Sequence, residues 1–337
     1  MSYERERQVA IEAVTAASRL CEAVRQSIPT AMEKDDRSPV TVADFGAQAI
    51  ICRALHEAFP EDAIVGEEDA AMLRGKEGNE YLTSVTDRVQ RQISTATPQE
   101  VMRWIDLGNG KVGDRFWTLD PIDGTKGFLR QDQYAIALAL IEDGEVKLGV
   151  LGCPALSFDV HTNELGGDIS ASQPTEDGDT KTGVLFEAVR GRGTTLRPIK
   201  GGEQSSIRVQ ETEGGGHWRL VESVEGSHSD LERQAKVAKA VGLKTPSLRL
   251  DSQAKYGALA WGLGVLYLRL PSPETPDYRE KIWDHAAGAI VVEEAGGRVT
   301  DMHGKPLDFS KNTKLIDNQG VVASNGKIHD AVIEALK

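Results

Sequence analysis

The second half of this 337-residue chain alternates short apolar strands with amphipathic helices, and this alternation limits the possible folds more than any other feature. Such a chain buries its apolar faces by packing helices against sheets, so we expect an α/β fold with layered helices and sheets. The expected strands lie at 220–224, 248–250, 265–270, 298–300 and 321–323. The expected helices lie at 230–241, 254–261, 284–295 and 328–336.

The first half begins with helices and then changes to strands. Apolar residues recur at helical spacing over 4–28, and again over 42–59, where Pro60 ends the run. Two apolar runs, 134–141 and 146–151, flank Asp143-Gly144 and predict a β-hairpin. Further strands are expected at 63–65, 158–161 and 184–189, a helix at 82–93, and a surface loop at 166–183. We place a boundary between two subdomains near residue 190, which gives 1–190 and 191–337.

Composition narrows the classes of function. Hydrophobic residues make up 39% of the chain and charged residues 27%, so a packed core is expected. The net charge of −13 disfavours nucleic acids and anionic membranes as general partners. Cys21, Cys52 and Cys153 form no close pair and are expected to be reduced thiols. Since residues 1–7 are too charged for a secretory signal and no apolar run could span a bilayer, we expect a cytoplasmic protein. Separately, we expect a monomer.

One loop concentrates residues that are suited to chemistry. The run 117–128 starts as a strand, and Pro121 is expected to end that strand in a tight turn. Asp120 and Asp123 lie three positions apart across Pro121, so the bend can aim both carboxylates and the Ile122 carbonyl at one point. Oxygen atoms that converge in this way suit a hard cation such as Mg²⁺. The same residues also fit an ordinary type I turn, and this loop alone leaves both interpretations open.

Three more acids stand where they can join this loop. Glu67 follows the strand at 63–65, Asp44 lies in the first turn of the second helix, and Asp284 begins a later helix. Each also has an ordinary explanation: a solvated loop for Glu67, a favourable helix dipole for Asp44 and an N-cap for Asp284. Carboxylates gathered in this number are costly to bury unless cations neutralise them, so we expect several Mg²⁺ ions to share them.

Three separated segments, taken together, resemble the motifs of the lithium-sensitive, Mg²⁺-dependent inositol monophosphatase superfamily, and they occur in that family's order. They are Val65-Gly66-Glu67-Glu68, Asp120-Pro121-Ile122-Asp123-Gly124-Thr125 and Trp283-Asp284-His285-Ala286-Ala287-Gly288. The resemblance spans nearly the whole chain. It implies a sandwich of αβαβα layers in two subdomains, like that of inositol monophosphatase and fructose-1,6-bisphosphatase.

Other stretches resemble one branch of this superfamily, the 3′(2′),5′-bisphosphate nucleotidases. These enzymes remove the 3′-phosphate of 3′-phosphoadenosine 5′-phosphate (PAP), and often that of its sulfated form, PAPS. The stretches are 126–130, 222–229, 251–257, 267–269 and 280–284.

The resemblance implies a role for each matching residue. The matching metal ligands, for two or three Mg²⁺ ions, are Glu67, Asp120, Ile122 through its carbonyl, Asp123 and Asp284. Asp44 matches the acid that polarises the Thr125 hydroxyl, which positions the water that attacks the 3′-phosphorus in line. The matching substrate contacts are Thr125, His228, Ser252, Lys255, Arg269 and Asp284. Without the resemblance, His228, Lys255 and Arg269 would be read as ordinary surface or packing residues.

The expected function is hydrolysis of PAP to AMP and phosphate, and of PAPS to APS, with inhibition by lithium. One alternative is a phosphatase of the same superfamily that acts on an inositol phosphate or fructose 1,6-bisphosphate. Another is a protein that senses PAP or Mg²⁺ without turnover. Residues 251–257 and the extended loop after Thr125 favour a nucleotide, and the Asp44 and Thr125 pair favours catalysis. The sequence leaves open the preference between PAP and PAPS, the number of ions and the role of 191–198.

Overall fold

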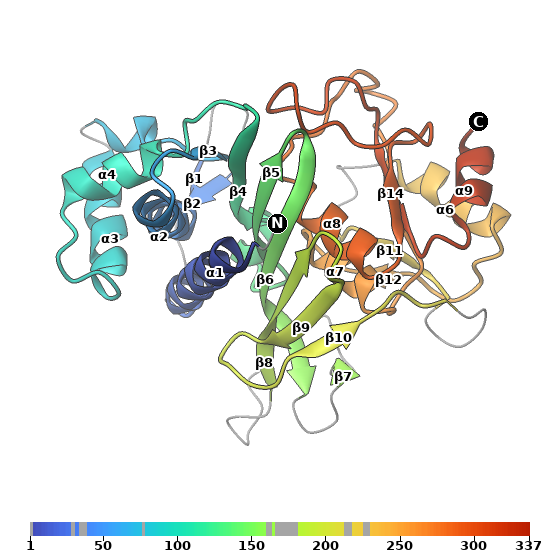
Figure 1. The fold of residues 1–337 in the computed structure, drawn as a ribbon, viewed down its shortest axis with the longest axis horizontal. Coiled ribbons are helices and arrows are strands. Elements are labelled where there is room, and N and C mark those ends of the chain that lie inside the picture. Colours follow the sequence, from blue (N-terminus) through green and yellow to red (C-terminus); the bar gives the residue numbers. More distant parts are fainter. Residues whose placement is uncertain are drawn as a thin grey trace.

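Helices and sheets alternate in five layers (Figure 1). The computed structural model describes residues 3–27, 31–33, 39–75, 78–159, 164–165, 181–211, 218–224 and 230–337. Within them, the first layer consists of helices α1 (Glu4–Arg25), α2 (Val42–Ala58), α3 (Gly78–Gln90) and α4 (Pro98–Asp106). The third layer contains α7 (Ala254–Ala260) and α8 (Ala286–Glu294), and the fifth contains α6 (Leu231–Ala240) and α9 (His329–Leu336). Two sheets fill the second and fourth layers, which confirms the expected αβαβα sandwich.

The larger sheet has eight strands within the described residues, and most neighbours are antiparallel. Its strands are β3 (Ala63–Gly66), β4 (Arg115–Asp123), β5 (Ala135–Glu142), β6 (Glu145–Asp159), β7 (Glu164–Leu165), β8 (Lys181–Val189), β9 (Thr194–Pro198) and β10 (Ser205–Ile207). They run in the order β10-β9-β8-β6-β5-β4-β3, with β7 paired to β6. Only β3 and β4 among these neighbours are parallel, so their carboxyl ends lie at the same edge. That edge carries Glu67 and Asp120, the first residues of the candidate site.

The smaller sheet has five strands in the described part of the chain and mixes both orientations. Its strands are β11 (Leu220–Glu222), β12 (Leu248–Arg249), β13 (Leu266–Arg269), β14 (Arg298–Thr300) and β15 (Val321–Ser324). Short elements complete the description: β1 (Ala31–Glu33) pairs with β2 (Pro39–Thr41), and η1 (Ala71–Leu73) and α5 (Thr125–Leu129) are single turns. The predicted alternation of strands and helices from residue 220 onward is therefore confirmed.

Within the described residues, three apolar cores lie between the layers, the middle one reaching both sheets, and β5 shows how a strand serves two cores. Ile136, Leu138 and Leu140 face the core under α1–α4, whereas the alternate residues Ala135, Ala137 and Ala139 face α8. Each large aliphatic side chain buried in this way contributes about 1.5–3 kcal/mol. The alanines allow α8 to lie close to the sheet, and so does Gly149 on β6, where an added Cβ would stand 2.4 Å from Ile290. This close packing fixes α8, and with it Asp284, against the larger sheet.

Four local expectations are wrong or incomplete. Pro121 does not end β4: the strand continues to Asp123, with a shift of register between Asp120 and Asp123 opposite β5. A bulge of this kind accommodates a residue without an N–H. Asp284 is not the N-cap of α8, because that helix starts at Ala286 behind His285. Helix α4 was not expected, and the unassigned segment 191–198 contributes β9.

The expected strand at 158–161 is described only for its first two residues, which belong to β6, and 166–180 of the expected surface loop lies outside the described residues. The division at residue 190 stays a prediction. The larger sheet continues through β9 and β10 to Ile207, which favours a boundary nearer that residue.

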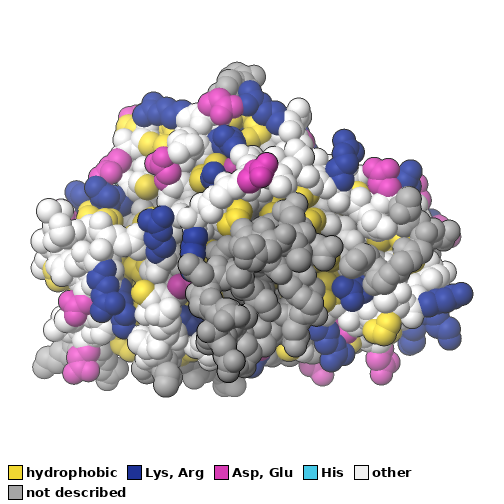
Figure 2. Space-filling model, turned by 90° about the horizontal axis from the view of Figure 1, so that it is seen from below, with side chains coloured by type: hydrophobic (Ala, Val, Ile, Leu, Met, Phe, Trp, Pro, Cys, Tyr) yellow, Lys and Arg dark blue, Asp and Glu magenta, His cyan; other side chains and the backbone are white. Residues whose placement is uncertain are grey.

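The surface carries charges of both signs, and the cysteines are free thiols. On the face in Figure 2, basic side chains lie among acidic ones over the described part, so neither sign dominates that face. Cys21, Cys52 and Cys153 are buried and unbridged, and burial raises the pKa of each thiol. Such thiols are inert structural residues. No helix within the described ranges is both long enough and apolar enough to cross a membrane.

Candidate active site

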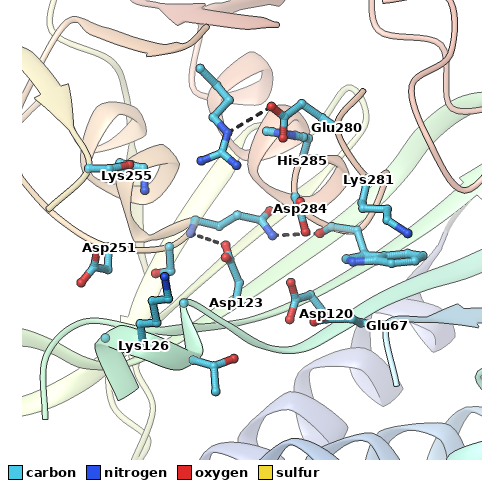
Figure 3. A pocket seen from close by; sticks show the side chains of 18 of the residues that line it. Glu67, Asp120, Asp123, Lys126, Asp251, Lys255, Glu280, Lys281, Asp284 and His285 are labelled. Atoms are coloured by element: carbon cyan, nitrogen blue, oxygen red, sulfur yellow. Dashed lines mark hydrogen bonds and ion pairs between the residues drawn. The ribbon is translucent and has the colours of Figure 1, made fainter. Parts of the chain in front are cut away.

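A cavity of about 600 Å³ lies where the end of β4 meets the start of α8 (Figure 3). The predicted site residues that line it are Glu67, Asp120, Ile122, Asp123, Thr125, Ser252, Lys255, Arg269 and Asp284. Asp44 lies behind this lining and bonds to Thr125. His228 lies outside the described residues. The structure thus brings together every predicted site residue that it describes.

The end of β4 presents its acids through the bulge. The backbone N–H of Ile122 donates to Asp120 Oδ1 at 3.1 Å, which turns that carboxylate toward the residues that follow it. Gly124 has a φ of 85°, a left-handed conformation that suits glycine, and it turns the chain into α5. Asp120 and Asp123 precede this bend and Thr125 follows it, and all three line one cavity.

Asp44 and Thr125 form the predicted acid and hydroxyl pair. The Thr125 hydroxyl lies 3.3 Å from Asp44 Oδ1 and 3.2 Å from the Ile122 carbonyl oxygen. Asp44 Oδ2 accepts from Thr41 twice, from its backbone N–H at 2.8 Å and its hydroxyl at 2.6 Å. Asp44 is fully buried and completes a capping box at the start of α2. The cap and the contact with Thr125 therefore use different oxygens of one carboxylate.

Glu67 reaches the site because β3 runs parallel to β4. The Glu67 backbone N–H donates to the Leu119 carbonyl at 3.1 Å, which sets Glu67 beside Asp120. The next residue, Glu68, is held by the buried amide of Gln48 on α2, since Gln48 Oε1 accepts from the Glu68 backbone at 3.1 Å. The loop that carries Glu67 is thus fixed on both sides.

The acids of the cavity are mutually repulsive. Burial, together with Glu67, Asp123 and Asp284, raises the pKa of Asp120 well above its usual range. Burial, together with Asp123 and other acids, raises the pKa of Asp284 in the same way. Ionising these clustered carboxylates is costly in free energy. Divalent cations that take oxygen ligands would offset this cost, so the cluster suits them. On this chemistry, the residues present fit the predicted Mg²⁺ ions.

A second group of possible ligands is formed by Glu280, Asp284 and His285, whose ligand atoms lie within 4.8 Å of one another. Glu280 is already engaged, since it accepts from Arg269 Nε at 3.1 Å and lies 3.3 Å from His285 Nε2. His285 Nδ1 is 2.7 Å from the Tyr256 hydroxyl. We therefore assign Glu280 and His285 to a buried network that positions Arg269, and keep Asp284 with the acids around β4.

Cationic side chains line the cavity opposite the acids. Lys255 is 5% exposed, and its ammonium lies 5.3 Å from the centre of the Tyr267 ring. Burial lowers the pKa of Lys255 to about 8, although Asp123 opposes this shift. Burial also opposes ionisation of Glu280, but Arg269 and His285 outweigh it and lower the pKa of Glu280 to about 2. Both Lys255 and Arg269 are thus charged near neutral pH and can bind an anion.

Several residues of the site were not singled out from the sequence. They are Gln253, Glu280, Tyr256, and Asp251 with its partner Arg130. Most are buried polar residues that act on another side chain, and neither spacing nor composition distinguishes them from core residues. The only available signal was position, since all lie within or next to stretches matched to the nucleotidases.

Comparison with known proteins agrees with this geometry. The model of the inositol monophosphatase family matches residues 4–337. The solved structures of Thermotoga maritima IMPase and of CysQ from Bacteroides thetaiotaomicron share the fold, with TM-scores of 0.60 and 0.59 at 23% and 20% identity. The first match covers 97% of this chain and 94% of the other, and the second covers 96% and 97%.

Two curated relatives are more similar to this chain in sequence than these two solved structures are. The 3′(2′),5′-bisphosphate nucleotidase of Emericella nidulans is 44% identical over 100% of this chain and 99% of its own length. The protein of the same name from Schizosaccharomyces pombe is 42% identical over 99% of this chain and 96% of its own. These matches confirm the resemblance on which the site prediction rested. The chain belongs to the inositol monophosphatase family and, within it, to the branch of the 3′(2′),5′-bisphosphate nucleotidases.

Proposed function

We propose that this protein is a Mg²⁺-dependent phosphatase that hydrolyses PAP to AMP and phosphate, accepts PAPS in the same way, and is inhibited by lithium. One observation carries the proposal. A single cavity is lined by a cluster of acids suited to metal ions and by the cation Lys255 (Figure 3), and Arg269 belongs to the same lining. A bisphosphate needs both: one phosphate at the metal centre and a second bound elsewhere. The names of the relatives support the same substrate.

The ligands that we propose for the metal are Glu67, Asp120, Asp123, Asp284 and the Ile122 carbonyl, with two or three Mg²⁺ ions shared among them. Bound Mg²⁺ would neutralise the phosphate oxygens and make water a better nucleophile. The acids hold their places by contacts made within the protein, as the bond from the Ile122 N–H to Asp120 illustrates. The site is therefore pre-organised in the way that metal catalysis requires.

Asp44 and Thr125 orient the nucleophile. When the Thr125 hydroxyl donates its hydrogen bond to Asp44 Oδ1 rather than to the Ile122 carbonyl, the hydroxyl oxygen can accept a hydrogen bond from the attacking water. The water oxygen bonds to the 3′-phosphorus as the bond from phosphorus to the ribose 3′-oxygen breaks. One water proton moves toward Asp44 through Thr125, and the departing 3′-oxygen takes a proton from a solvent water to give AMP. Fixing the water in this way lowers the entropic cost of attack.

Lys255 and Arg269 are proposed to bind the 5′-phosphate, and Ser252 lies beside them in the lining. Arg269 is oriented by Glu280, which leaves the other guanidinium nitrogens for the ligand. Arginine suits such a role because its planar fork binds two phosphate oxygens at once. His228 remains a predicted substrate contact.

The test is phosphate release from PAP, PAPS, inositol 1-phosphate and inositol 1,4-bisphosphate, with and without Mg²⁺ and Li⁺. We expect the largest kcat/KM with PAP or PAPS, dependence on Mg²⁺ and inhibition by Li⁺. A larger kcat/KM with inositol 1-phosphate would reject the substrate. Nucleotide binding without any phosphate release would instead support a sensor.

A further inference from the structure

Gln253 joins the two halves of the cavity through both its backbone and its side chain. Its backbone N–H donates to Asp123 Oδ2 at 2.6 Å. Its side-chain amide donates to the Trp283 carbonyl at 2.9 Å and accepts from the Gly288 N–H at 3.0 Å. The residue is 1% exposed, so these bonds are shielded from water. One buried residue thus contacts the ligand Asp123 directly and brackets the segment that carries Asp284.

We propose that Gln253 is a positioning residue that sets the spacing between Asp123 and Asp284 and thereby controls the affinity of the site for divalent cations. The inference rests on the metal site proposed above and assigns to Gln253 no contact with substrate or metal. Outer partners of this kind commonly govern metal affinity, because they orient the groups that bind the ion.

The side-chain amide of Gln253 bonds to the backbone just before α8 and within its first turn. Trp283 immediately precedes Asp284, and the Gly288 N–H is one of the first N–H groups of α8, which have no partner inside the helix. His285, the N-cap of α8, makes no side-chain cap. The amide of Gln253 supplies the missing acceptor and adds a donor to the Trp283 carbonyl. A side chain with only one of these functions would hold only one end of the segment.

The backbone contact of Gln253 depends on a disfavoured conformation of its neighbour. Ser252 has a φ of 64°, a left-handed conformation that is disfavoured for a residue with a side chain. The turn at Ser252 also packs on Gly124, where an added Cβ would stand 3.0 Å from Ser252 Cβ. The bonds of Gln253 stabilise this turn. They thereby maintain the left-handed conformation of Ser252, which points the Gln253 N–H at Asp123.

The experiment compares three variants of the full-length chain after metal removal. Gln253→Met keeps size and the backbone N–H but removes the amide. Gln253→Asn keeps an amide that is too short to reach both Trp283 and Gly288. Gln234→Met is the matched control, because Gln234 is equally buried but lies on α6, away from the cavity lining. Mn²⁺ binding is measured by the electron paramagnetic resonance of the free ion, and folding by near-ultraviolet circular dichroism.

We expect Mn²⁺ affinity to fall about 10- to 100-fold in Gln253→Met and Gln253→Asn and to be unchanged in Gln234→Met. The Mg²⁺ concentration for half-maximal activity should rise in parallel, with kcat largely recovered at saturating Mg²⁺. Affinity within twofold of wild type in a folded Gln253 variant would overturn the inference, and if Gln253→Met does not fold, Gln253→Asn decides. Failure of the wild-type protein itself to bind Mn²⁺ would instead reject the metal centre, so the two failures are distinguishable.

Discussion

Thr125 and Asp44 are 81 positions apart in the chain, and the Thr125 hydroxyl lies 3.3 Å from Asp44 Oδ1. The contact joins the bend after β4 to the first turn of α2, where Asp44 also accepts from Thr41. The consequence for catalysis can be separated from the consequence for folding, because the two contacts use different oxygens.

Asp44→Asn is expected to lower kcat about 10²- to 10⁴-fold, the usual range for loss of a proton acceptor. Stability should fall by about 1 kcal/mol, because an amide nitrogen cannot replace an acceptor in the capping box. Mn²⁺ and substrate binding should be largely unchanged. The measurements are steady-state kinetics with PAP and urea unfolding.

Glu100→Gln is the matched control, since Glu100 completes the same kind of capping box with Thr97 at the start of α4, away from the cavity. Because the bonds between Glu100 and Thr97 are exposed and glutamine still supports a capping box, this variant should lose less stability than Asp44→Asn and keep full activity. Wild-type turnover by Asp44→Asn would exclude the proposed role of Asp44.

Lys255 predicts an alkaline limit to substrate binding. Its pKa of about 8 lies below the ordinary value of 10.5, so its charge is present below pH 8 and is lost as the pH rises through that value. We expect kcat/KM for PAP to fall above pH 8, mainly through a rise in KM. In Lys255→Arg the fall should move up by more than one pH unit, because guanidinium stays protonated. Lys239→Arg, on the exposed end of α6, serves as control. An unmoved alkaline limb in Lys255→Arg would show that another group titrates.

After metal removal, the stability of the protein should fall as the pH rises. In the metal-free protein the pKa values of Asp120 and Asp284 lie above those of the unfolded chain. Stability is then fully present at acid pH and is lost as the pH rises and the clustered acids ionise. The rise in Tm on adding Mg²⁺ should therefore be larger at pH 8 than at pH 5.5. Asp120→Asn should raise the metal-free Tm at pH 8 while abolishing activity. A Tm increment from Mg²⁺ that is independent of pH would contradict this account.

Glu280 predicts the opposite dependence. Its pKa of about 2 lies below the ordinary 4.5, so the stability it contributes is present above pH 4.5 and is lost as the pH falls toward 2. Glu280→Gln should lower stability at pH 7 by about 3 kcal/mol, since it leaves Arg269 without its buried partner. The KM for PAP should rise because Arg269 is no longer oriented. Glu334→Gln, in an exposed pair with Lys337, is expected to change stability by less than about 0.5 kcal/mol. Equal effects of the two substitutions in chemical denaturation would refute the role of Glu280.

Much of the fold was predictable because periodicity is a local property. The helices at Glu4–Arg25 and Val42–Ala58, and the hairpin through Asp143-Gly144, follow directly from spacing and turn residues. Helix α4 was predictable but missed: Thr97, Pro98 and Glu100 are the residues of a capped helix start. The error at Pro121 has a different origin. A proline was taken to end a strand, whereas the register shift opposite β5 accommodates it.

The residues of the candidate site also fall into two groups, those that the sequence predicts and those that it does not. Acids such as Asp120 and Glu67 could be predicted because they follow apolar strands, and family motifs identify them. The network of Tyr256, His285 and Glu280 could not, since a buried hydrogen bond between residues 29 positions apart leaves no periodic trace. Gln253 likewise depends on a backbone conformation at Ser252 that the sequence does not reveal.

The capping box at Thr41 and Asp44 has a consequence for how such a chain can change over evolutionary time. With its proposed role in turnover, Asp44 would serve both folding and the reaction, whereas Thr125 bonds to Asp44 or the Ile122 carbonyl without capping a helix. A descendant that kept the fold but no longer needed the reaction would be expected to lose Thr125 first. The acid at position 44 would then persist as a helix cap in a protein that had ceased to be an enzyme.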